Sequence, residues 1–476
     1  MSRVIVVGAS IGGLSAALLL ARAGHEVVVF DGDDVAPGDP DDVIARAFRP
    51  GAPHAVQAHA FLARGRMVLR ERLPVLARLY EQGVVDLPLP PPPSLAGHVV
   101  EPDADLVFLM CRRALAEWAL RAAASTQEGL EVRSRAKVVG FGVDDSGAVP
   151  RVVGVTSDSG QVEAADIVVD ASGRRSSTVR WLRRSLGLDL VVRSEECGLV
   201  YFGRAYRTRD GVTSLPPLNR GFAAGAVLPR FTALLAPCEK GHVLVAITPL
   251  AADIEMKGVR SPHAFDEVLR SVGAVSPWLD ALQPTSGVYA MGGLQSTLVR
   301  IVRDGEPVVH GVHVIGDACS TTSPTYGRGL SWALAHAGVV ADAIAQHPDD
   351  LDRQAHSIDT WVTDELEPFY DDAIAVDASR VQTMRAAMLG QLAPAVAPQT
   401  TGARTDTSRP TWAGIFAASF SDPYVWSRLA RYQSLLATPH ELYNDATVRE
   451  RVAQLGSRPM PVPAGPTNED LSTIFA

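Results

Sequence analysis

Cysteine is scarce in this chain. Its 476 residues include only Cys111, Cys197, Cys238 and Cys319, and none of these is paired at the spacing of metal ligands. So few cysteines in so long a chain form neither a disulfide framework nor a zinc site. We therefore expect no bound metal ion and a cytoplasmic, reducing environment.

Lysine is scarcer still. Lys137, Lys240 and Lys257 are the only lysines, and the net charge is −9 without a long basic run. Binding to the phosphates of a nucleic acid requires clustered Lys and Arg. A nucleic-acid partner is therefore not expected.

Long hydrophobic runs are also lacking. No segment reaches the ~18 apolar residues of a membrane-spanning helix. The apolar N-terminus is interrupted by Gly8, Gly12 and Gly13, so it predicts a strand, a turn and a helix rather than a signal peptide. With 47% hydrophobic and 20% charged residues, the composition is typical of a globular protein, and the length predicts two or three domains.

The first 31 residues carry a nucleotide-binding pattern. A β-branched run at 4–7 precedes the glycine-rich segment 8–13 and the apolar stretch 14–23, and a second β-branched run at 27–30 ends in Asp31. This order of strand, glycine turn, helix, strand and acid is the fingerprint of a Rossmann-type dinucleotide site. It predicts a doubly wound α/β domain in which Asp31 accepts hydrogen bonds from ribose hydroxyls.

The residues of the glycine-rich segment have separate roles. Gly8 permits a tight turn, and Gly13 lets the helix pack closely on the strand. The backbone at Ser10, Ile11 and Gly12 is expected to face a pyrophosphate at the positive end of the helix. Ser10 stands where the pattern has its middle glycine, and a residue this small should be tolerated.

Two further motifs follow much later in the chain. A buried-type strand at 166–169 leads into the segment Asp170-Ala171-Ser172-Gly173-Arg174-Arg175-Ser176 and then Arg180. The other motif is Val314-Ile315-Gly316-Asp317-Ala318-Cys319-Ser320, followed by Pro324, Gly327, Gly329 and a helical stretch from Leu330 to His347.

Together the three motifs resemble those of the FAD-dependent monooxygenases of the para-hydroxybenzoate hydroxylase and squalene epoxidase type. That family has a glycine-rich N-terminal motif and a central motif with Asp-Gly before a Ser and an Arg. Its C-terminal Gly-Asp motif has a Pro eight residues after the Gly and then two glycines spaced by one residue. The resemblance covers about residues 1 to 380. It implies a glutathione-reductase-like FAD-binding domain, an antiparallel β substrate domain and a helical C-terminal region.

The resemblance also assigns residues to the cofactor. It implies that Asp317 bonds the ribityl or ribose region of FAD and that Pro324 lies beside the isoalloxazine ring. It implies that the backbone at Gly327, Gly329 and Leu330, at a helix N-terminus, stabilises negative charge on reduced flavin.

Ser172 and Gly173 fall in the central motif and are assigned to the cofactor. Two more segments match the family locally. The segment 112–118 resembles the Arg-x-x-Leu helix whose Arg approaches FAD. Arg112 has the spacing to Leu115, and Arg113 is the alternative if the register is shifted by one. The segment Arg49-Pro50-Gly51-Ala52-Pro53, with His59 and Arg64-Gly65, resembles a loop common in bacterial members.

Some positions depart from the family. Ser172 stands where the central motif has its Asp, and the acid here is Asp170. In the family that Asp helps to bind NADPH as well as FAD. Direct reduction by NAD(P)H and reduction through a separate flavin reductase therefore both stay open. Ser320 and Ser331 replace the His and Asn of many hydroxylases.

Several residues near these motifs have competing interpretations. Asp170 either caps the turn after its strand or contacts the cofactor. Tyr326 and Arg328 lie in the flavin-facing loop and are the candidate active-site residues, Tyr326 for substrate contact and Arg328 for favouring anionic flavin. For the others we favour a structural interpretation. A solvated basic face is expected for Arg174, Arg175, Arg183 and Arg184. His54 and His59 are expected to be hydrogen-bonded loop residues, and Cys319 a small packed side chain.

The motifs imply a discontinuous FAD-binding domain built from 1–75, 101–190 and 285–345. The substrate domain is expected at 76–100 and 191–284 and should contain an antiparallel sheet. Residues 346–476 are expected to form a helical region with a loose tail at 459–466. The strand-like stretches of that sheet are 199–206, 222–229, 231–236 and 242–248, and 88–93 is a proline-rich loop at its entrance.

The leading interpretation is a monooxygenase, a hydroxylase or epoxidase, that uses FAD, NAD(P)H and O₂ on a lipophilic small-molecule or natural-product substrate. A flavin-dependent reductase of the geranylgeranyl reductase type and a redox-neutral flavin cyclase are the alternatives, because they share the fold. A flavin-dependent halogenase is disfavoured, because its Trp-x-Trp-x-Ile-Pro motif is missing and the nearest stretch is 245–249.

Overall fold

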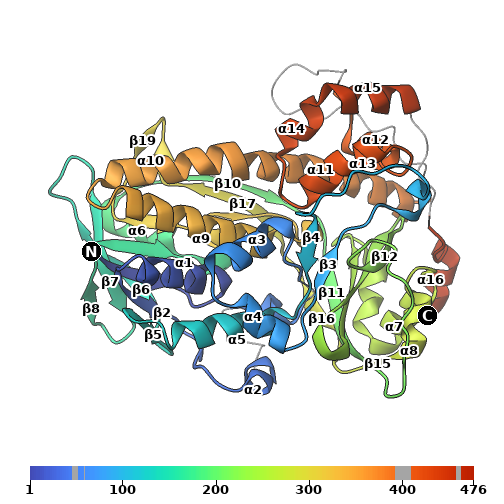
Figure 1. The fold of residues 1–476 in the computed structure, drawn as a ribbon, viewed down its shortest axis with the longest axis horizontal. Helices are drawn as coiled ribbons and strands as arrows, with labels where there is room; N and C mark the ends of the chain where they lie inside the picture. Colours follow the sequence, from blue (N-terminus) through green and yellow to red (C-terminus); the bar gives the residue numbers. More distant parts are fainter. Residues whose placement is uncertain (46–51, 58, 392–408, 457–462) are drawn as a thin grey trace.

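The computed structural model describes residues 1–45, 52–57, 59–391, 409–456 and 463–476 of the protein. Arg49, Pro50 and Gly51 of the predicted bacterial-type loop and residues 459–462 of the predicted tail therefore lie outside the described residues. The architecture is shown in Figure 1.

The N-terminal pattern forms the centre of a five-stranded parallel sheet with the order β20-β9-β1-β2-β5. Its strands are β1 (Arg3–Val7), β2 (Glu26–Phe30), β5 (Leu130–Arg133), β9 (Ile167–Asp170) and β20 (Val312–Val314). β1 and β9 lie in the middle and are made of β-branched residues that are almost entirely buried, as expected for a strand covered on both faces. The predicted doubly wound α/β fold is thus confirmed.

Helices cover this sheet. α1 (Ile11–Arg22) connects β1 to β2 and begins at Ile11, three residues before the predicted apolar stretch. α9 (Gly329–Gln346) packs along α1, and α10 (Leu351–Trp361) packs on α9, so the three helices lie side by side (Figure 1). The other helices of the N-terminal half are α2 (Pro40–Ala45), α3 (Ala63–Arg72), α4 (Leu76–Glu81), α5 (Arg113–Ala124) and α6 (Thr178–Leu186).

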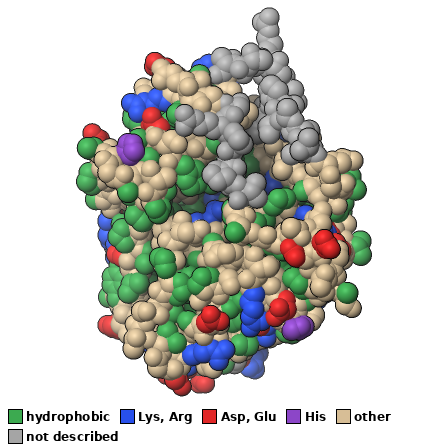
Figure 2. Space-filling view, turned by 90° about the vertical axis from the view of Figure 1, so that its right-hand side faces the viewer, with side chains coloured by type: hydrophobic (Ala, Val, Ile, Leu, Met, Phe, Trp, Pro, Cys, Tyr) green, Lys and Arg blue, Asp and Glu red, His purple; other side chains and the backbone are tan. Residues whose placement is uncertain are grey.

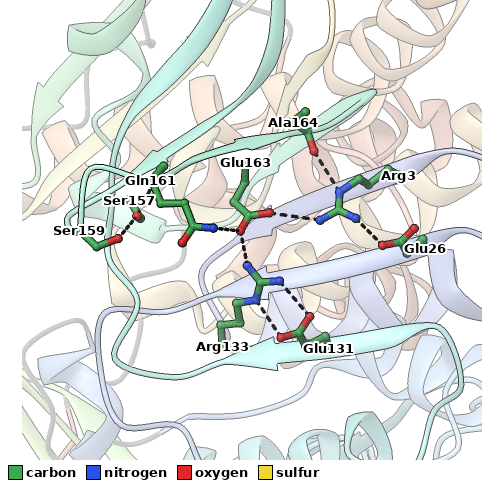
Figure 3. A network of polar contacts seen from close by, with 9 residues as sticks. All are labelled: Arg3, Glu26, Glu131, Arg133, Ser157, Ser159, Gln161, Glu163 and Ala164. Atoms are coloured by element: carbon green, nitrogen blue, oxygen red, sulfur yellow. Dashed lines mark hydrogen bonds and ion pairs between the residues drawn. The ribbon is translucent and has the colours of Figure 1, made fainter.

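A three-stranded antiparallel meander connects β5 to β9. It consists of β6 (Val138–Asp144), β7 (Arg151–Ser157) and β8 (Val162–Ala164). Glu163 on β8 accepts hydrogen bonds from Arg3 of β1 at 3.2 Å and from Arg133 of β5 at 2.7 Å, as Figure 3 shows. One half-buried carboxylate therefore joins the meander to two strands of the parallel sheet.

The predicted antiparallel sheet is present; we call it the substrate sheet, and the part of the chain that carries it the substrate domain, after the role predicted for them. Its main path is β12-β13-β14-β11-β15, and β16 pairs with β11. The strands are β11 (Tyr201–Thr208), β12 (Ala224–Val227), β13 (Phe231–Pro237), β14 (His242–Pro249), β15 (Leu282–Pro284) and β16 (Tyr289–Met291). The first four match the four strand-like stretches. Helices α7 (Pro262–Arg270) and α8 (Ser276–Ala281) bury their apolar side chains in the same core as this sheet.

A third sheet is separate from the two larger ones. It pairs β10 (Val191–Glu196), β17 (Gln295–Arg300) and β21 (Ser320–Thr321) in antiparallel fashion. β10 therefore pairs outside the substrate sheet, although its residues open the predicted segment 191–284. The predicted entrance loop borders the short hairpin of β3 (Asp86–Pro88) and β4 (Val107–Leu109), and β18 (Val302–Arg303) pairs with β19 (Glu306–Pro307).

The chain after α10 is helical, as predicted. The helices are α11 (Glu367–Met388), α12 (Trp412–Ala418), α13 (Pro423–Gln433), α14 (Pro439–Asn444), α15 (Ala446–Leu455) and α16 (Asn468–Phe475). α16 returns to the substrate domain, where Leu471 is buried in the core beneath the sheet. On the face that these helices share with the substrate domain, basic and acidic side chains are interspersed with hydrophobic ones (Figure 2).

Candidate functional site

The glycine turn after β1 has room only for glycine at two positions. Gly8 has a φ of +105°, and a Cβ there would lie 2.5 Å from the carbonyl oxygen of Ala171. A Cβ at Gly13 would lie 1.8 Å from the carbonyl oxygen of Gly8. A Cβ at Gly12 would meet Ala333 at ordinary contact distances, 3.4 Å from its Cβ and 3.7 Å from its carbonyl oxygen. The backbone of the turn thus lies in contact with Ala171, directly after β9. The turn leads into the N-terminus of α1, where no side chain caps the free N–H groups.

Ser10, in place of the middle glycine, is part of a charged network. Its hydroxyl donates to Glu117 at 2.7 Å and accepts from Arg113 at 2.5 Å. Glu117 also bonds Arg113 and Arg121, each four residues away on α5. Two guanidinium groups for one carboxylate leave this network with an excess positive charge beside the glycine turn. A pyrophosphate is the kind of group that such a charge attracts.

The structure distinguishes the two candidate arginines of the Arg-x-x-Leu segment. Arg112 precedes α5, and its side chain and backbone N–H both bond Glu239 of the substrate domain, at 2.5 and 3.0 Å. Arg113 instead faces the glycine turn and contacts Ser10 and His54. Of the two candidates, Arg113 therefore lies at the glycine turn, and its contact with the cofactor stays a prediction.

Asp31 lies at the end of β2, as the fingerprint requires. Its carboxylate accepts hydrogen bonds from the backbone N–H of Ala9 at 2.7 Å and of Asp33 at 2.8 Å. It therefore stabilises the glycine turn directly, at the position predicted for a ribose contact.

The central motif is organised around Asp170. This side chain is fully buried, and its oxygens accept from the backbone N–H and hydroxyl of Ser172, and from the hydroxyls of Ser176 and Thr178, at 2.5 to 2.9 Å. Of its two predicted roles, the geometry supports the turn cap. Ser172 and Gly173 form the turn itself and remain partly exposed.

Asp317 lies in the 3₁₀ turn at Gly316–Ala318, which follows β20. Burial raises the pKa of its carboxyl group, and the positive charges of Arg113 and Arg174 oppose that rise. A Cβ on Gly329, the first residue of α9, would lie 3.7 Å from the Asp317 Oδ1. The structure thus brings Asp317 into the field of Arg113, about 200 residues away in sequence, at the carboxyl edge of the parallel sheet.

The loop before α9 exposes backbone at its tip. Pro324 and Gly329 are exposed, whereas Leu330 is buried in the main core. Gly327 has a φ of +64°, a left-handed conformation that favours glycine. The N-terminus of α9 has no side-chain cap, so its N–H groups are available to a negatively charged ligand.

Tyr326 and Arg328 point away from the tip of this loop. The Tyr326 hydroxyl donates towards Asp377 of α11 at 3.0 Å. Arg328 is 3% exposed and donates to the Tyr432 hydroxyl at 2.7 Å, with Asp372 at 3.9 Å. Its guanidinium lies among aromatic rings of the C-terminal helices. These contacts do not support the prediction that Arg328 faces the flavin.

The serines that replace the family's His and Asn differ in their surroundings. Ser331 is fully buried and accepts from the backbone N–H of Leu62 at 2.9 Å, which ties α9 to the segment before α3. Ser320 is half-buried in β21. Cys319 is buried and contacts the Val299 carbonyl at 3.6 Å, as expected for a packed side chain.

His54 and His59 lie next to this network. Burial, together with the nearby charges of Arg113 and His59, lowers the pKa of His54 to about 2. Burial lowers the pKa of His59 to about 4, again with Arg113, while its Nδ1 lies 2.8 Å from the Gln57 carbonyl oxygen. Both are therefore neutral at physiological pH and serve as hydrogen-bonding loop residues. Arg174 and Arg175 are exposed, in agreement with a solvated basic face.

Glu117 was missed by the sequence motifs. Its spacing of four residues from Arg113 and from Arg121 on one helix face is a signal that could have found it. Among the residues that the structure describes, no group of three or more His, Cys, Asp and Glu side chains is arranged to hold a metal ion. No helix in the described part of the chain is long and apolar enough to cross a membrane.

The parallel sheet and its glycine turn are those of a Rossmann-like α/β fold with added antiparallel sheets, and residues 6–70 match the NAD(P)-binding Rossmann-like domain family. No curated protein sequence matches the chain.

Solved structures share the architecture over most of the chain. PqsL of Pseudomonas aeruginosa, a probable FAD-dependent monooxygenase, is similar with a TM-score of 0.59 and 17% identity, over 82% of this chain and 100% of PqsL. The p-nitrophenol 4-monooxygenase PnpA of Pseudomonas putida is similar with a TM-score of 0.60 and 17% identity, over 92% of this chain and 100% of PnpA. The flavin-dependent brominase Bmp2 is similar with a TM-score of 0.63 and 14% identity, over 95% of this chain and 98% of Bmp2. The chain therefore has the fold shared by FAD-dependent monooxygenases and flavin-dependent halogenases.

Proposed function

We propose that this protein is an FAD-dependent monooxygenase acting on a lipophilic small molecule. The observation that carries the proposal is the convergence of the glycine turn, Arg113, Asp317 and the uncapped N-terminus of α9 at one edge of the parallel sheet. These groups come from three distant segments and share one chemical character, that of a receptor for an extended, phosphate-bearing dinucleotide.

The residues present fit FAD. Gly8 and Gly13 allow a tight turn that no side chain would fit, and the N-terminus of α1 with Arg113 offers donors to a pyrophosphate. Asp31 and Asp317 would accept hydrogen bonds from ribose and ribityl hydroxyls. The backbone at Gly327, Gly329 and Leu330 would face the ring. Bound there, FAD would supply the transfer of electrons from NAD(P)H to O₂ that hydroxylation or epoxidation requires.

The protein would contribute the surroundings of that chemistry. The substrate sheet, the C-terminal helices and the loop before α9 exclude water and orient the substrate. An apolar cluster that includes Phe108, Phe222 and Phe369 lies between the sheet and the helices, which favours a lipophilic substrate. Ser172, in place of the family's Asp, favours electron delivery through a separate flavin reductase, although direct reduction by NAD(P)H is the competing route.

The proposal is tested on the purified protein. Bound FAD would give absorbance near that of an oxidised flavoprotein, and a colourless protein that also refuses added FAD would overturn it. The rate at which NADPH bleaches this absorbance, with and without an added flavin reductase, then decides the route of the electrons. Turnover without oxygen incorporation would assign a reductase instead, and turnover without NAD(P)H consumption a redox-neutral cyclase.

A further inference from the structure

A cluster of polar side chains lies where the substrate sheet, the loop before α9 and α11 meet. We call it the Asp377 cluster; it consists of Tyr201, Thr325, Tyr326, Asp377 and Arg380. The Asp377 Oδ1 accepts from the Tyr326 hydroxyl at 3.0 Å and from Arg380 at 3.1 Å, and Arg380 also donates to the Thr325 hydroxyl at 2.7 Å. One hydrogen-bond network thus joins the loop before α9 to α11, and Tyr201 of the substrate sheet lies beside it.

Two buried polar atoms of this cluster have no partner among the described residues. They are the hydroxyl of Tyr201, which lies near the side chains of Thr248 and Thr325 without a well-formed hydrogen bond, and the Oδ2 of Asp377; the two residues are 7% and 4% exposed. Buried polar groups in native proteins are nearly always hydrogen-bonded, so each such atom requires an explanation. The two atoms are complementary, because a phenol hydroxyl donates and a carboxylate oxygen accepts.

The charges of the cluster favour a neutral partner. The carboxylate of Asp377 is balanced by the guanidinium of Arg380. Burial raises the pKa of Asp377 to about 6, against the opposing influence of Arg380 and Tyr326, so the carboxylate still predominates at neutral pH. Burial raises the pKa of Tyr201 as well, so its hydroxyl keeps the proton that it can donate.

The cluster borders the proposed flavin site. Thr325 and Tyr326 belong to the loop that begins with Pro324. Cys197, which packs with Tyr201, lies within the electrostatic field of both Asp377 and Arg174. Arg174 in turn acts on Asp317. The unpartnered atoms therefore lie beside the loop that we propose faces the flavin.

We propose that the Asp377 cluster is the polar end of the substrate site and binds a neutral hydroxyl group, phenolic or enolic, of the substrate. The substrate oxygen accepts a hydrogen bond from Tyr201, and its hydrogen is donated to the Asp377 Oδ2. This assignment rests on the proposed function, since it presumes that a small molecule is held beside the flavin. It makes Asp377, which lies outside all three sequence motifs, a determinant of specificity.

The test uses the FAD-loaded protein and three matched pairs of probes: phenol and anisole, 1-naphthol and 1-methoxynaphthalene, and 4-phenylphenol and 4-methoxybiphenyl. Each methyl ether keeps the acceptor oxygen and loses the donor hydrogen. Binding is measured by the change in the absorbance of bound FAD and, independently of the flavin, by the shift in thermal unfolding. In at least one pair the hydroxyl compound should bind about tenfold or more tightly than its ether, because it donates to a charged acceptor.

Variants assign that preference to the cluster. Asp377→Asn should reduce the preference for hydroxyl over ether to about threefold or less, because the acceptor loses its charge. Tyr201→Phe should weaken both members of a pair alike. Asp371→Asn on the same helix, where Asp371 pairs with Arg193 at the surface, is the matched control and should change neither affinity.

Equal affinity for the two members of every pair would overturn the proposal. So would a preference that survives in Asp377→Asn, or an FAD-loaded protein that binds none of the six probes. If the purified protein binds no FAD, the proposed function is overturned instead. That result is seen before any probe is added, so the two failures are distinguishable.

Discussion

Gly13, in the predicted dinucleotide turn, has no room for a Cβ atom. We predict that Gly13→Val abolishes folding or FAD binding, because a Cβ there would lie 1.8 Å from the Gly8 carbonyl oxygen. Gly140→Ala on β6 is the control and should keep both, since a Cβ there would meet no atom within 4 Å. Soluble yield, thermal unfolding and flavin content distinguish the two. A Gly13→Val protein with wild-type flavin content would contradict the geometry.

The role proposed for Asp317 can be tested by removing its carboxylate. Asp317→Ala should lose most of its bound flavin, because a hydrogen bond to a charged acceptor contributes ~1.5–3 kcal/mol. Flavin content after purification and FAD titration of the apoprotein measure the effect, expected as a ten- to hundredfold weaker affinity. Asp349→Ala, at an exposed position beyond the other end of α9, should bind FAD like the wild type. Undiminished yellow colour in the Asp317 variant would remove this residue from the site.

Two buried histidines predict an acid-sensitive fold. Burial lowers the pKa of His313 to about 4 and of His336 to about 3, and neither His336 nitrogen has a partner among the described residues. The unfolded chain takes up protons near pH 6.5, whereas the folded one does not. Stability is therefore full above about pH 6.5 and falls as the pH drops towards 4, by roughly 2 kcal/mol per histidine at pH 5.

Urea unfolding at pH 7.5 and pH 5 checks this dependence. His336→Leu should reduce the loss of stability between the two pH values by about 2 kcal/mol, because one titrating group is removed. His440→Leu, which changes an exposed histidine on α14, is the control and should leave the loss in place. The same loss in wild type and His336→Leu would rule out the contribution of His336.

At the scale of an element, α11 joins the loop before α9 to the C-terminal helices. Asp372 accepts hydrogen bonds from the hydroxyls of Tyr432 and Tyr443, and Arg328 lies beside the same carboxylate. All of these side chains are buried. Asp372→Ala should therefore destabilise the protein by roughly 3–5 kcal/mol, because it leaves a buried guanidinium without its counter-charge.

The neighbouring acid on α11 provides the comparison. Asp371 pairs with Arg193 at the surface, where both side chains are more than 40% exposed, so Asp371→Ala should cost less than about 1 kcal/mol. Chemical denaturation of the two variants measures the difference in the free energy of unfolding. Similar losses in both would mean that the buried network contributes no more than a surface ion pair.

At the scale of the whole molecule, the last helix completes the core of the substrate domain. Leu471 of α16 is 1% exposed in that core, and Ser472 bonds Glu255 at 2.6 Å. Leu471→Ala should therefore lower the free energy of unfolding by about 2–5 kcal/mol through a buried cavity. Thermal unfolding measures it against Thr473→Ala, an exposed neighbour whose loss should be small. Equal midpoints would show that α16 does not support the domain.

Much of the architecture is determined by local sequence. The alternation of β-branched strand, glycine turn and apolar helix predicts β1, α1 and β2, because these elements depend on residues within a few positions of each other. The same holds for the four main strands of the substrate sheet and for the helical character of the chain after residue 346. The pairing of β10 with β17 was not predicted, since about 100 residues separate the two strands.

The partners of side chains were decided by tertiary structure alone. Motif spacing does not predict that Arg112 bonds Glu239 whereas Arg113 bonds Ser10, because Glu239 is more than 100 residues away in sequence. Likewise, Arg328 lies in a flavin-type motif but bonds Tyr432, and Asp377 carries no motif at all. Sequence periodicity specifies which face of an element is buried. Which polar group meets which depends on how distant segments pack, and that is determined only when the whole chain folds.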